Sequence, residues 1–292
     1  MLLYSQHKTL HKKDIEEQLN IFYQEDQIYN DLSTLYTTNN NNPYITAALF
    51  AEEDLIVAGL SIIDVMFQKH KVKKHKKDGE LCASGDNICS ITAPAAKLLS
   101  YERILLNLIQ RMSGIASLTN LYVKTLNSPT IKILDTRKTT PGLRLFEKHA
   151  VSIGGGYNHR FDLNDGVMIK DNHLTIINDL DLTLQTLKAD HPNKKIELEV
   201  DNINQLELFL TSLSTRLDAV LLDNMNKHQT IQCVELIRKH HSNCFIESSG
   251  GINLHNILNY KDTSVDGISI GALTHQAKSK NIKLEFKSHD TQ

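Results

Sequence analysis

The chain has 292 residues, of which 40% are hydrophobic and 23% charged, and its formal net charge is -2. This is globular composition, with room for one large domain or two of ordinary size. It lacks the basic excess of a nucleic-acid binder, and no apolar run is long enough to cross a bilayer. We expect neither a signal peptide nor a membrane anchor, and the four cysteines show no metal-ligand spacing. A cytoplasmic protein with reduced thiols is therefore expected.

The first part of the chain predicts a mixture of helices and short strands. Apolar residues recur at helical spacing within residues 11–27. Residues 45–60 predict two strands around an acidic turn, and residues 59–70 predict a helix. The densely basic run Lys69–Lys77 then predicts an exposed loop or hairpin tip, although a role in attracting anions remains open.

A long helical pattern follows this basic run. Residues 94–112 begin with a proline, which the first turn of a helix tolerates, and continue with apolar residues at helical spacing. Gly114 interrupts the pattern, and a second helical run is expected to end near residue 126. This part of the chain therefore predicts two consecutive helices.

From Thr130 onward, short β-branched strands alternate with helical segments. Helices are expected within 173–187, 204–213 and 227–240. Such alternation favours parallel strands with right-handed crossovers, as in a β/α barrel. The predicted strands cover residues 131–135, 166–170, 195–200, 217–223, 244–249 and 267–271.

Charged or glycine-rich residues stand where these strands end. One strand that ends in a charge says little, because many strands end at water. Six such ends in order favour a shared site, since the carboxyl ends of barrel strands converge. The residues concerned are Asp135, Lys170, Glu199, Asp223, Ser249 with the glycines that follow it, and Gly271.

Basic residues are concentrated in the first two of these strand ends. Clustered guanidinium and ammonium groups bind dicarboxylates or phosphates, although any one of them could instead form a surface ion pair. The run DTRKTTPGLR places three cations beside a Thr-Pro-Gly turn, which favours a binding loop. The cationic set is Arg137, Lys138, Arg144, His159, Arg160 and Lys170.

The two carboxylates, Glu199 and Asp223, end successive strands. They could coordinate Mg²⁺, accept hydrogen bonds from ribose hydroxyls or stabilise a developing cation, and they could also merely balance the lysines. Two later loops, ESSGGI and ISIGAL, let backbone N–H groups approach a phosphate. The residues alone thus indicate an enzyme that binds a phosphorylated sugar and an anionic co-substrate.

Longer motifs extend this interpretation. The run ILDTRKTTPGLRLFEKHAVSIGGGYNHRFDLNDGVMIKDNHL resembles the signature region of the quinolinate phosphoribosyltransferases. Other runs match in the same order over roughly residues 25–275: YERILLNLIQRMSGIAS, IELEVDN, LLDNM, ESSGGI and ISIGALTH. The match departs from the family pattern at Asn30-Asp31, where Gly-Asp is usual, and in ICSITAPAAK, which lacks a usual glycine.

The resemblance implies an N-terminal α/β sandwich (residues 1–128, joined by a tail at about 276–292) and an open β/α-barrel-like domain (129–275). It also implies a homodimer in which Arg103 reaches the partner's site. The implied reaction joins quinolinate to phosphoribosyl pyrophosphate with Mg²⁺ and releases CO₂, in NAD biosynthesis. No nucleic acid or membrane takes part.

The resemblance also implies roles for individual residues. Lys138, Glu199 and Asp223 would be catalytic, the last two with a possible Mg²⁺ ion. The alternatives are a molybdate-transport-associated paralogue, a nicotinate phosphoribosyltransferase and a non-catalytic sugar-phosphate binder. The implied substrate-binding residues are Arg103, Thr136, Arg137, Lys138, His159, Arg160, Lys170, Glu199, Asp223, Ser249, Gly250, Gly251, Ser269, Gly271 and Ala272.

Overall fold

The computed structural model describes residues 2–286, which form two compact units. We call them the sandwich unit (residues 7–120, 140–155 and 276–286) and the barrel unit (residues 2–6, 121–139 and 156–275). This division differs from the expected one in three places. The first few residues and residues 121–128 go with the barrel unit, and residues 140–155 go with the sandwich unit.

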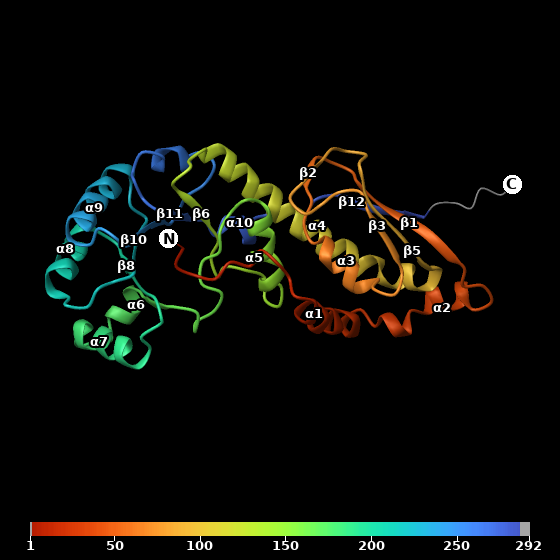
Figure 1. Cartoon of the computed structure of the whole chain (residues 1–292), viewed down its shortest axis with the longest axis horizontal. Coiled ribbons are helices and arrows are strands. Elements are labelled where there is room, and N and C mark those ends of the chain that lie inside the picture. The colour runs from red at the N-terminus through yellow and green to blue at the C-terminus, as the bar shows by residue number, and fades with distance from the viewer. Residues whose placement is uncertain (1, 287–292) are drawn as a thin grey trace. The chain divides into compact units, whose positions relative to one another are not determined.

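The sandwich unit is built on a four-stranded antiparallel sheet with the order β12-β1-β5-β3. Figure 1 shows helices α3 and α4 running beside this sheet. A separate two-stranded pair joins β2 (Leu55–Ile56) to β4 (Leu81–Cys82). The sheet strands are β1 (Tyr44–Ala51), β3 (Lys71–Lys74), β5 (Asn87–Pro94) and β12 (Ile282–Phe286). The helices are α1 (Lys12–Glu25), η1 (Ile28–Asn30), α2 (Leu32–Thr38), α3 (Leu60–Met66) and α5 (Arg144–Ile153).

Two predictions for this unit are wrong. Four residues of the basic run form the edge strand β3, whose exposed lysines are a common protection of an open sheet edge. The second wrong prediction is the break at Gly114, because α4 (Ala95–Leu126) is one continuous helix. Gly114 is needed for a different reason: a Cβ there would lie 2.1 Å from the carbonyl oxygen of Lys278.

The barrel unit contains all six predicted strands in one parallel sheet with the order β6-β11-β10-β9-β8-β7. The α/β class and the parallel arrangement are therefore confirmed. Tyr157 adds a parallel bridge to Leu134 at one edge, so the sheet stays short of the eight strands of a closed barrel. The strands are β6 (Lys132–Leu134), β7 (Val167–Ile169), β8 (Ile196–Val200), β9 (Ala219–Asp223), β10 (Phe245–Ser249) and β11 (Gly267–Ser269).

Helices connect these strands and cover the sheet, as Figure 1 shows for α8 and α9. Side-chain caps fix where several helices begin: Asn202 accepts from the amide of Gln205, and Asn226 forms a reciprocal capping box with Gln229. Each helix therefore starts just after its strand. The barrel-unit helices after α4 are α6 (Asp171–Leu174), α7 (Leu180–Asp190), α8 (Ile203–Ser212), α9 (Lys227–His240), η2 (Ile257–Tyr260) and α10 (Ala272–His275).

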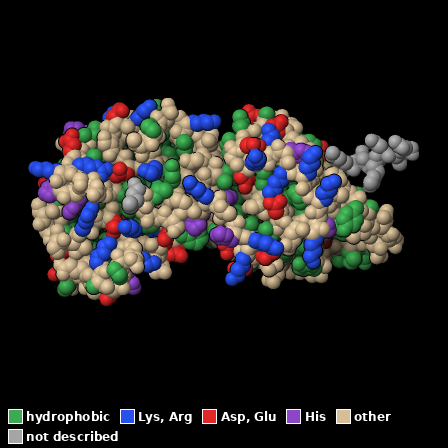
Figure 2. All heavy atoms as spheres, viewed as in Figure 1, with side chains coloured by type: hydrophobic (Ala, Val, Ile, Leu, Met, Phe, Trp, Pro, Cys, Tyr) green, Lys and Arg blue, Asp and Glu red, His purple; other side chains and the backbone are tan. Residues whose placement is uncertain are grey.

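Acidic and basic side chains are interspersed over the face that Figure 2 shows, in keeping with a net charge near zero. All four cysteines are buried with free thiols. Within residues 2–286, no helix is both long enough and apolar enough to cross a membrane.

Candidate active site

Three predicted site residues, Glu199, Asp223 and Ser249, lie at the carboxyl edge of the parallel sheet. The register pairs Glu199 with Leu221 and Asp223 with Ser249, so β8, β9 and β10 end at nearly the same level. Residues two apart on a strand point to the same face. Glu197 and Glu199 therefore share one face of β8, and Glu197 lies one layer deeper in the sheet.

Lys170 and Glu199 form an ion pair at this edge. Lys170 follows β7 directly and caps α6, and its backbone amide donates to His173 Nδ1 at 3.0 Å. Burial raises the pKa of Glu199, and the charges of Asp223 and Asp171 add to this, while Lys170 opposes them. Glu199 thus lies near the negative charges of Asp223 and Asp171 and is paired with the positive charge of Lys170.

Asp223 and the first glycine loop are joined through Asn224. The side-chain amide of Asn224 donates to Asp223 Oδ2 at 2.6 Å, and its backbone amide donates to the carbonyl of Ser249 at 2.9 Å. Gly250 has a φ of +87°, and a Cβ there would lie 2.3 Å from Asn224 Oδ1. Glycine is required here because both the conformation and the close approach exclude a side chain.

Lys138 lies against the second glycine loop. The hydroxyl of Thr274 donates to the carbonyl of Lys138 at 2.6 Å. A Cβ on Gly271 would lie 2.8 Å from Lys138 Cδ and 3.2 Å from His275 Nε2. The hydroxyl of Thr136 accepts from the amide of Lys138 at 3.0 Å, which shapes the start of the cationic loop. His275 is thus an addition to the site that the sequence did not suggest.

Asp135 holds the segment that carries His159 and Arg160. It is fully buried and accepts from the His159 amide at 2.9 Å and from the Asn158 side chain at 2.6 Å. The guanidinium of Arg160 is buried and donates to the carbonyl of Gly166 at 3.0 Å. Asp135, identified in the sequence as a strand end, therefore positions the cations.

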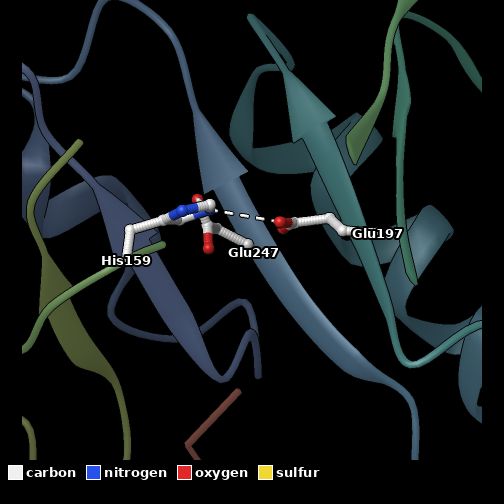
Figure 3. Close-up of side chains that lie close together, drawn as sticks. All are labelled: His159, Glu197 and Glu247. Carbon is white, nitrogen blue, oxygen red and sulfur yellow. Dashed lines mark ion pairs between the residues drawn. The ribbon is translucent and has the colours of Figure 1, made fainter. Parts of the chain in front are cut away.

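His159 points into the sheet interior, where one of its ring nitrogens faces two carboxylates that the sequence interpretation missed. Its Nε2 lies 3.2 Å from Glu197 Oε2 and 3.6 Å from Glu247 Oε1, as Figure 3 shows. Its Nδ1 accepts from the amide of Arg160 at 2.8 Å. Glu197 could have been found from the sequence, because it shares a strand face with Glu199. No local signal marked Glu247.

The remaining predicted residues are placed as follows. Arg137 is half-buried beside Lys138, and Ser269 is buried at the end of β11. Ala272 begins α10, and Gly251, with a φ of +60°, follows Gly250. Arg103 is exposed on α4 in the sandwich unit and does not belong to the barrel unit.

The fold is that of an α/β protein of the β/α-barrel type, with basic residues, two carboxylates and two glycine loops near one edge of its parallel sheet. The family model for the quinolinate phosphoribosyl transferase N-terminal domain matches residues 31–113, and the model for its C-terminal domain matches residues 115–285. The chain belongs to the quinolinate phosphoribosyltransferase family.

Individual relatives agree with this assignment. A Bacillus subtilis protein, described as a probable nicotinate-nucleotide pyrophosphorylase (carboxylating), is 39% identical over 277 residues, which cover 93% of each chain. The nicotinate-nucleotide pyrophosphorylase (carboxylating) of Mycobacterium leprae is 36% identical over 83% of this chain and 86% of its own length. The crystal structure of NadC from Streptococcus pyogenes superposes with a TM-score of 0.86 at 35% identity, over 96% of this chain and 99% of that one.

Proposed function

We propose that this protein transfers the phosphoribosyl group of phosphoribosyl pyrophosphate to the ring nitrogen of quinolinate. The adjacent carboxylate then leaves as CO₂, which gives nicotinate mononucleotide and pyrophosphate for NAD biosynthesis. The supporting observation is the meeting of cations, two carboxylates and two glycine loops at one sheet edge, in a chain of this family.

Quinolinate carries two carboxylates, and the cations of the barrel unit fit this charge. Arg137, Arg160 and Lys170 would hold the carboxylates, since guanidinium groups bind them through charge-assisted hydrogen bonds. His159 belongs to the same predicted set, but both of its ring nitrogens already face protein groups.

Phosphoribosyl pyrophosphate would occupy the remaining part of the edge. Lys138 would neutralise the departing pyrophosphate, and the 5-phosphate would rest on the loops that begin at Ser249 and Gly271. Breaking the bond at C1 gives the ribose oxocarbenium character, which Glu199 and Asp223 would stabilise. After transfer, the pyridinium ring accepts the electrons that the departing CO₂ leaves behind.

Mg²⁺ is proposed as the metal of this reaction, with Glu199 and Asp223 as the residues nearest to it. The two side chains fit this metal, because Mg²⁺ prefers oxygen ligands. Burial is the main cause that raises the pKa of Glu199, and the negative charge of Asp223 raises it further. A cation there would relieve this repulsion. When bound, Mg²⁺ would supply positive charge to the pyrophosphate and would keep several of its waters.

A homodimer with shared sites is also proposed. Its support is Arg103, whose exposed position on α4 of the sandwich unit leaves it available to a partner. A cytoplasmic location is proposed as well, because a reducing compartment would preserve the four free thiols.

The deciding experiment is an assay of the purified protein with quinolinate, phosphoribosyl pyrophosphate and Mg²⁺ that follows CO₂ and the mononucleotide. Quinolinate should be preferred over nicotinate by about ten- to a hundredfold in kcat/KM, since a charge-assisted hydrogen bond contributes about 1.5–3 kcal/mol. Comparable use of nicotinate would contradict the proposal. Binding of both substrates without turnover would favour a non-catalytic sugar-phosphate binder.

A further inference from the structure

A closed polar cluster lies inside the barrel unit, one layer deeper than Glu199. The Nε2 end of the His159 ring points toward the side chains of Glu197, from β8, and Glu247, from β10 (Figure 3). Both carboxylates are fully buried. The hydroxyl of Tyr4 donates to Glu197 Oε2 at 2.8 Å, and the Tyr4 ring packs on the His159 ring with centroids 4.7 Å apart.

The hydrogen bonds around the His159 ring determine its tautomer. The amide of Arg160 donates to Nδ1, so this nitrogen presents a lone pair. The hydrogen of the neutral ring is then on Nε2, where it faces Glu197. One histidine and two carboxylates within 4.8 Å could suggest a metal site, but Nε2 has no lone pair to offer a metal in this tautomer. The cluster is better suited to share a proton.

The charges of the cluster show where that proton lies. Beside a neutral ring, two ionised carboxylates would leave two uncompensated negative charges in a closed site. Glu197 Oε2 accepts from the Tyr4 hydroxyl at 2.8 Å and faces the N–H of His159 Nε2 at 3.2 Å, so two donors stabilise its negative charge. Glu197 is therefore the ionised member of the pair, and it accepts the hydrogen bonds.

Glu247 has fewer stabilising neighbours. Within residues 2–286, no hydrogen bond of good geometry reaches either of its oxygens. Burial raises the pKa of Glu247 to about 7, and Glu197 and Asp135 add to burial, whereas the Ser269 hydroxyl and a protonated His159 oppose it. Glu247 is therefore the neutral acid below neutral pH and ionises as the pH passes about 7. The titratable and hydroxyl groups that act on it are His159, Glu197, Asp135, Tyr4 and Ser269, while Arg160 acts on Glu197 and Tyr4.

The His159 ring connects this cluster to Arg160. Its Nδ1 accepts the backbone N–H of Arg160, whose guanidinium is held against Gly166. If Nδ1 gained a proton, it could no longer accept that bond, and the Arg160 backbone would have to shift. An ionised Glu247 would promote this change, because a second carboxylate at 3.6 Å from Nε2 favours the imidazolium form.

We propose that Glu197 and Glu247 are positioning residues that hold His159 so that Arg160 is placed for quinolinate, Glu197 as an anion and Glu247 as a neutral acid. The inference rests on the proposed function, because it takes Arg160 as a quinolinate ligand. It predicts that the KM for quinolinate rises as the pH passes neutrality and that the KM for phosphoribosyl pyrophosphate does not follow.

The test compares the wild type with Glu247→Gln, Glu197→Gln and the control Glu235→Gln, which changes an exposed glutamate on α9. Both KM values and kcat are measured between about pH 6 and 9. Glutamine resembles the neutral acid, so Glu247→Gln should keep a low quinolinate KM and lose its rise at high pH. Glu197→Gln removes the anion and should raise the quinolinate KM about tenfold even at low pH. The control should follow the wild type throughout.

Two outcomes would overturn the inference: an unchanged alkaline rise in Glu247→Gln, or equal increases of both KM values in Glu197→Gln. Melting temperatures and calorimetric quinolinate binding, measured well below the melting range, separate mispositioning from unfolding. If the wild type has no activity, the proposed function fails. The charge assignment of the cluster is then tested by the pH dependence of the melting temperature alone. Wild-type stability should then fall as the pH rises toward about 7, where only the folded state keeps the Glu247 proton. Persistence of that fall in Glu247→Gln would refute the cluster's charge assignment.

Discussion

The ammonium group of Lys170 forms an ion pair with the carboxylate of Glu199 across the neighbouring strands β7 and β8. The pair joins a residue assigned to quinolinate with one assigned to the ribose or the metal. A change in the charge of Glu199 should therefore affect both the quinolinate region and the ribose region of the site. Because the pKa of Glu199 is raised, a change of pH can produce this change of charge.

The first prediction concerns the acid side of the pH profile. Burial, with Asp223 and Asp171, raises the pKa of Glu199, so its carboxylate is lost as the pH falls through a value above that of an ordinary glutamate. We expect kcat to fall over that range. Glu199→Gln should have a low kcat and no such acid limb, and the exposed control Glu207→Gln on α8 should match the wild type. An unchanged acid limb in Glu199→Gln would assign the titration to another group.

The second prediction separates Arg137 from Glu199. Arg137→Ala removes a cation from a carboxylate and should weaken quinolinate binding by about 1.5–3 kcal/mol. Glu199→Ala should lower kcat more than it weakens quinolinate binding, because the ribose gains positive charge only in the transition state. Calorimetry with quinolinate and steady-state rates would measure both effects. The reverse pattern would exchange the two assignments.

A third prediction uses the two adjacent glycines of the first loop as a matched pair. Gly250→Ala would place a Cβ 2.3 Å from Asn224 Oδ1 at a φ of +87°, whereas the nearest atom to a Cβ on Gly251 is 3.9 Å away. Gly250→Ala should lower the free energy of unfolding by about 2 kcal/mol or more and raise the KM for phosphoribosyl pyrophosphate. Gly251→Ala should cost about 1–2 kcal/mol from its left-handed conformation alone. Denaturant unfolding and substrate kinetics of both variants would test this. Equal effects of the two substitutions would show that the close approach of Asn224 to Gly250 does not matter.

The fourth prediction tests the shared site of the proposed homodimer. Arg103→Ala and Lys138→Ala subunits should each be inactive alone. Mixing them should restore part of the activity, because a hybrid dimer can contain one site with both residues intact. Subunit exchange must be shown independently, for example with two differently tagged chains. Exchange without recovery would indicate that each site is complete within one chain.

A fifth prediction concerns stability in the sandwich unit. Arg111 binds the fully buried Glu147 through two nitrogens at 3.0 and 2.9 Å, and the amide of Thr140 donates to Glu147 at 3.0 Å. Glu147→Gln should lower the free energy of unfolding by about 3 kcal/mol, because it leaves a partly buried cation without its anion. Glu17→Gln, which breaks an exposed pair with Lys13, should cost less than about 0.5 kcal/mol. Denaturant titration of both variants would show the difference.

The barrel strands could be predicted from the sequence because they are buried on both faces. β8 and β9 are almost wholly buried; β9 appears as an apolar run that ends in Asp223, and β8 carries Glu197 and Glu199 among its apolar residues. The same reasoning located Glu199 and Asp223, since both stand at the ends of such runs. The carboxyl ends of parallel strands always lie at the same edge of the sheet. Residues at these ends can therefore be placed together without knowledge of any individual long-range contact.

The features that escaped prediction depend on contacts between distant residues. Gly114 appeared to break a helix because its close approach to the Lys278 backbone has no local signature. Tyr4 reaches Glu197 across most of the chain, and nothing near either residue predicts that hydrogen bond. β5 and the lysine-rich β3 were missed because their pairing partners determine them more than their composition does.

The pairing of β12 with β1 also sets an order of events as the chain is synthesised. β1 is made early, but its neighbour β12 follows the entire barrel segment. Until then β1 keeps one row of backbone donors and acceptors unpaired, along a strand that contains the fully buried Ala47, Ala48 and Leu49. The sandwich unit is therefore begun first and completed last. A nascent chain stalled within the barrel segment would expose this edge to other chains.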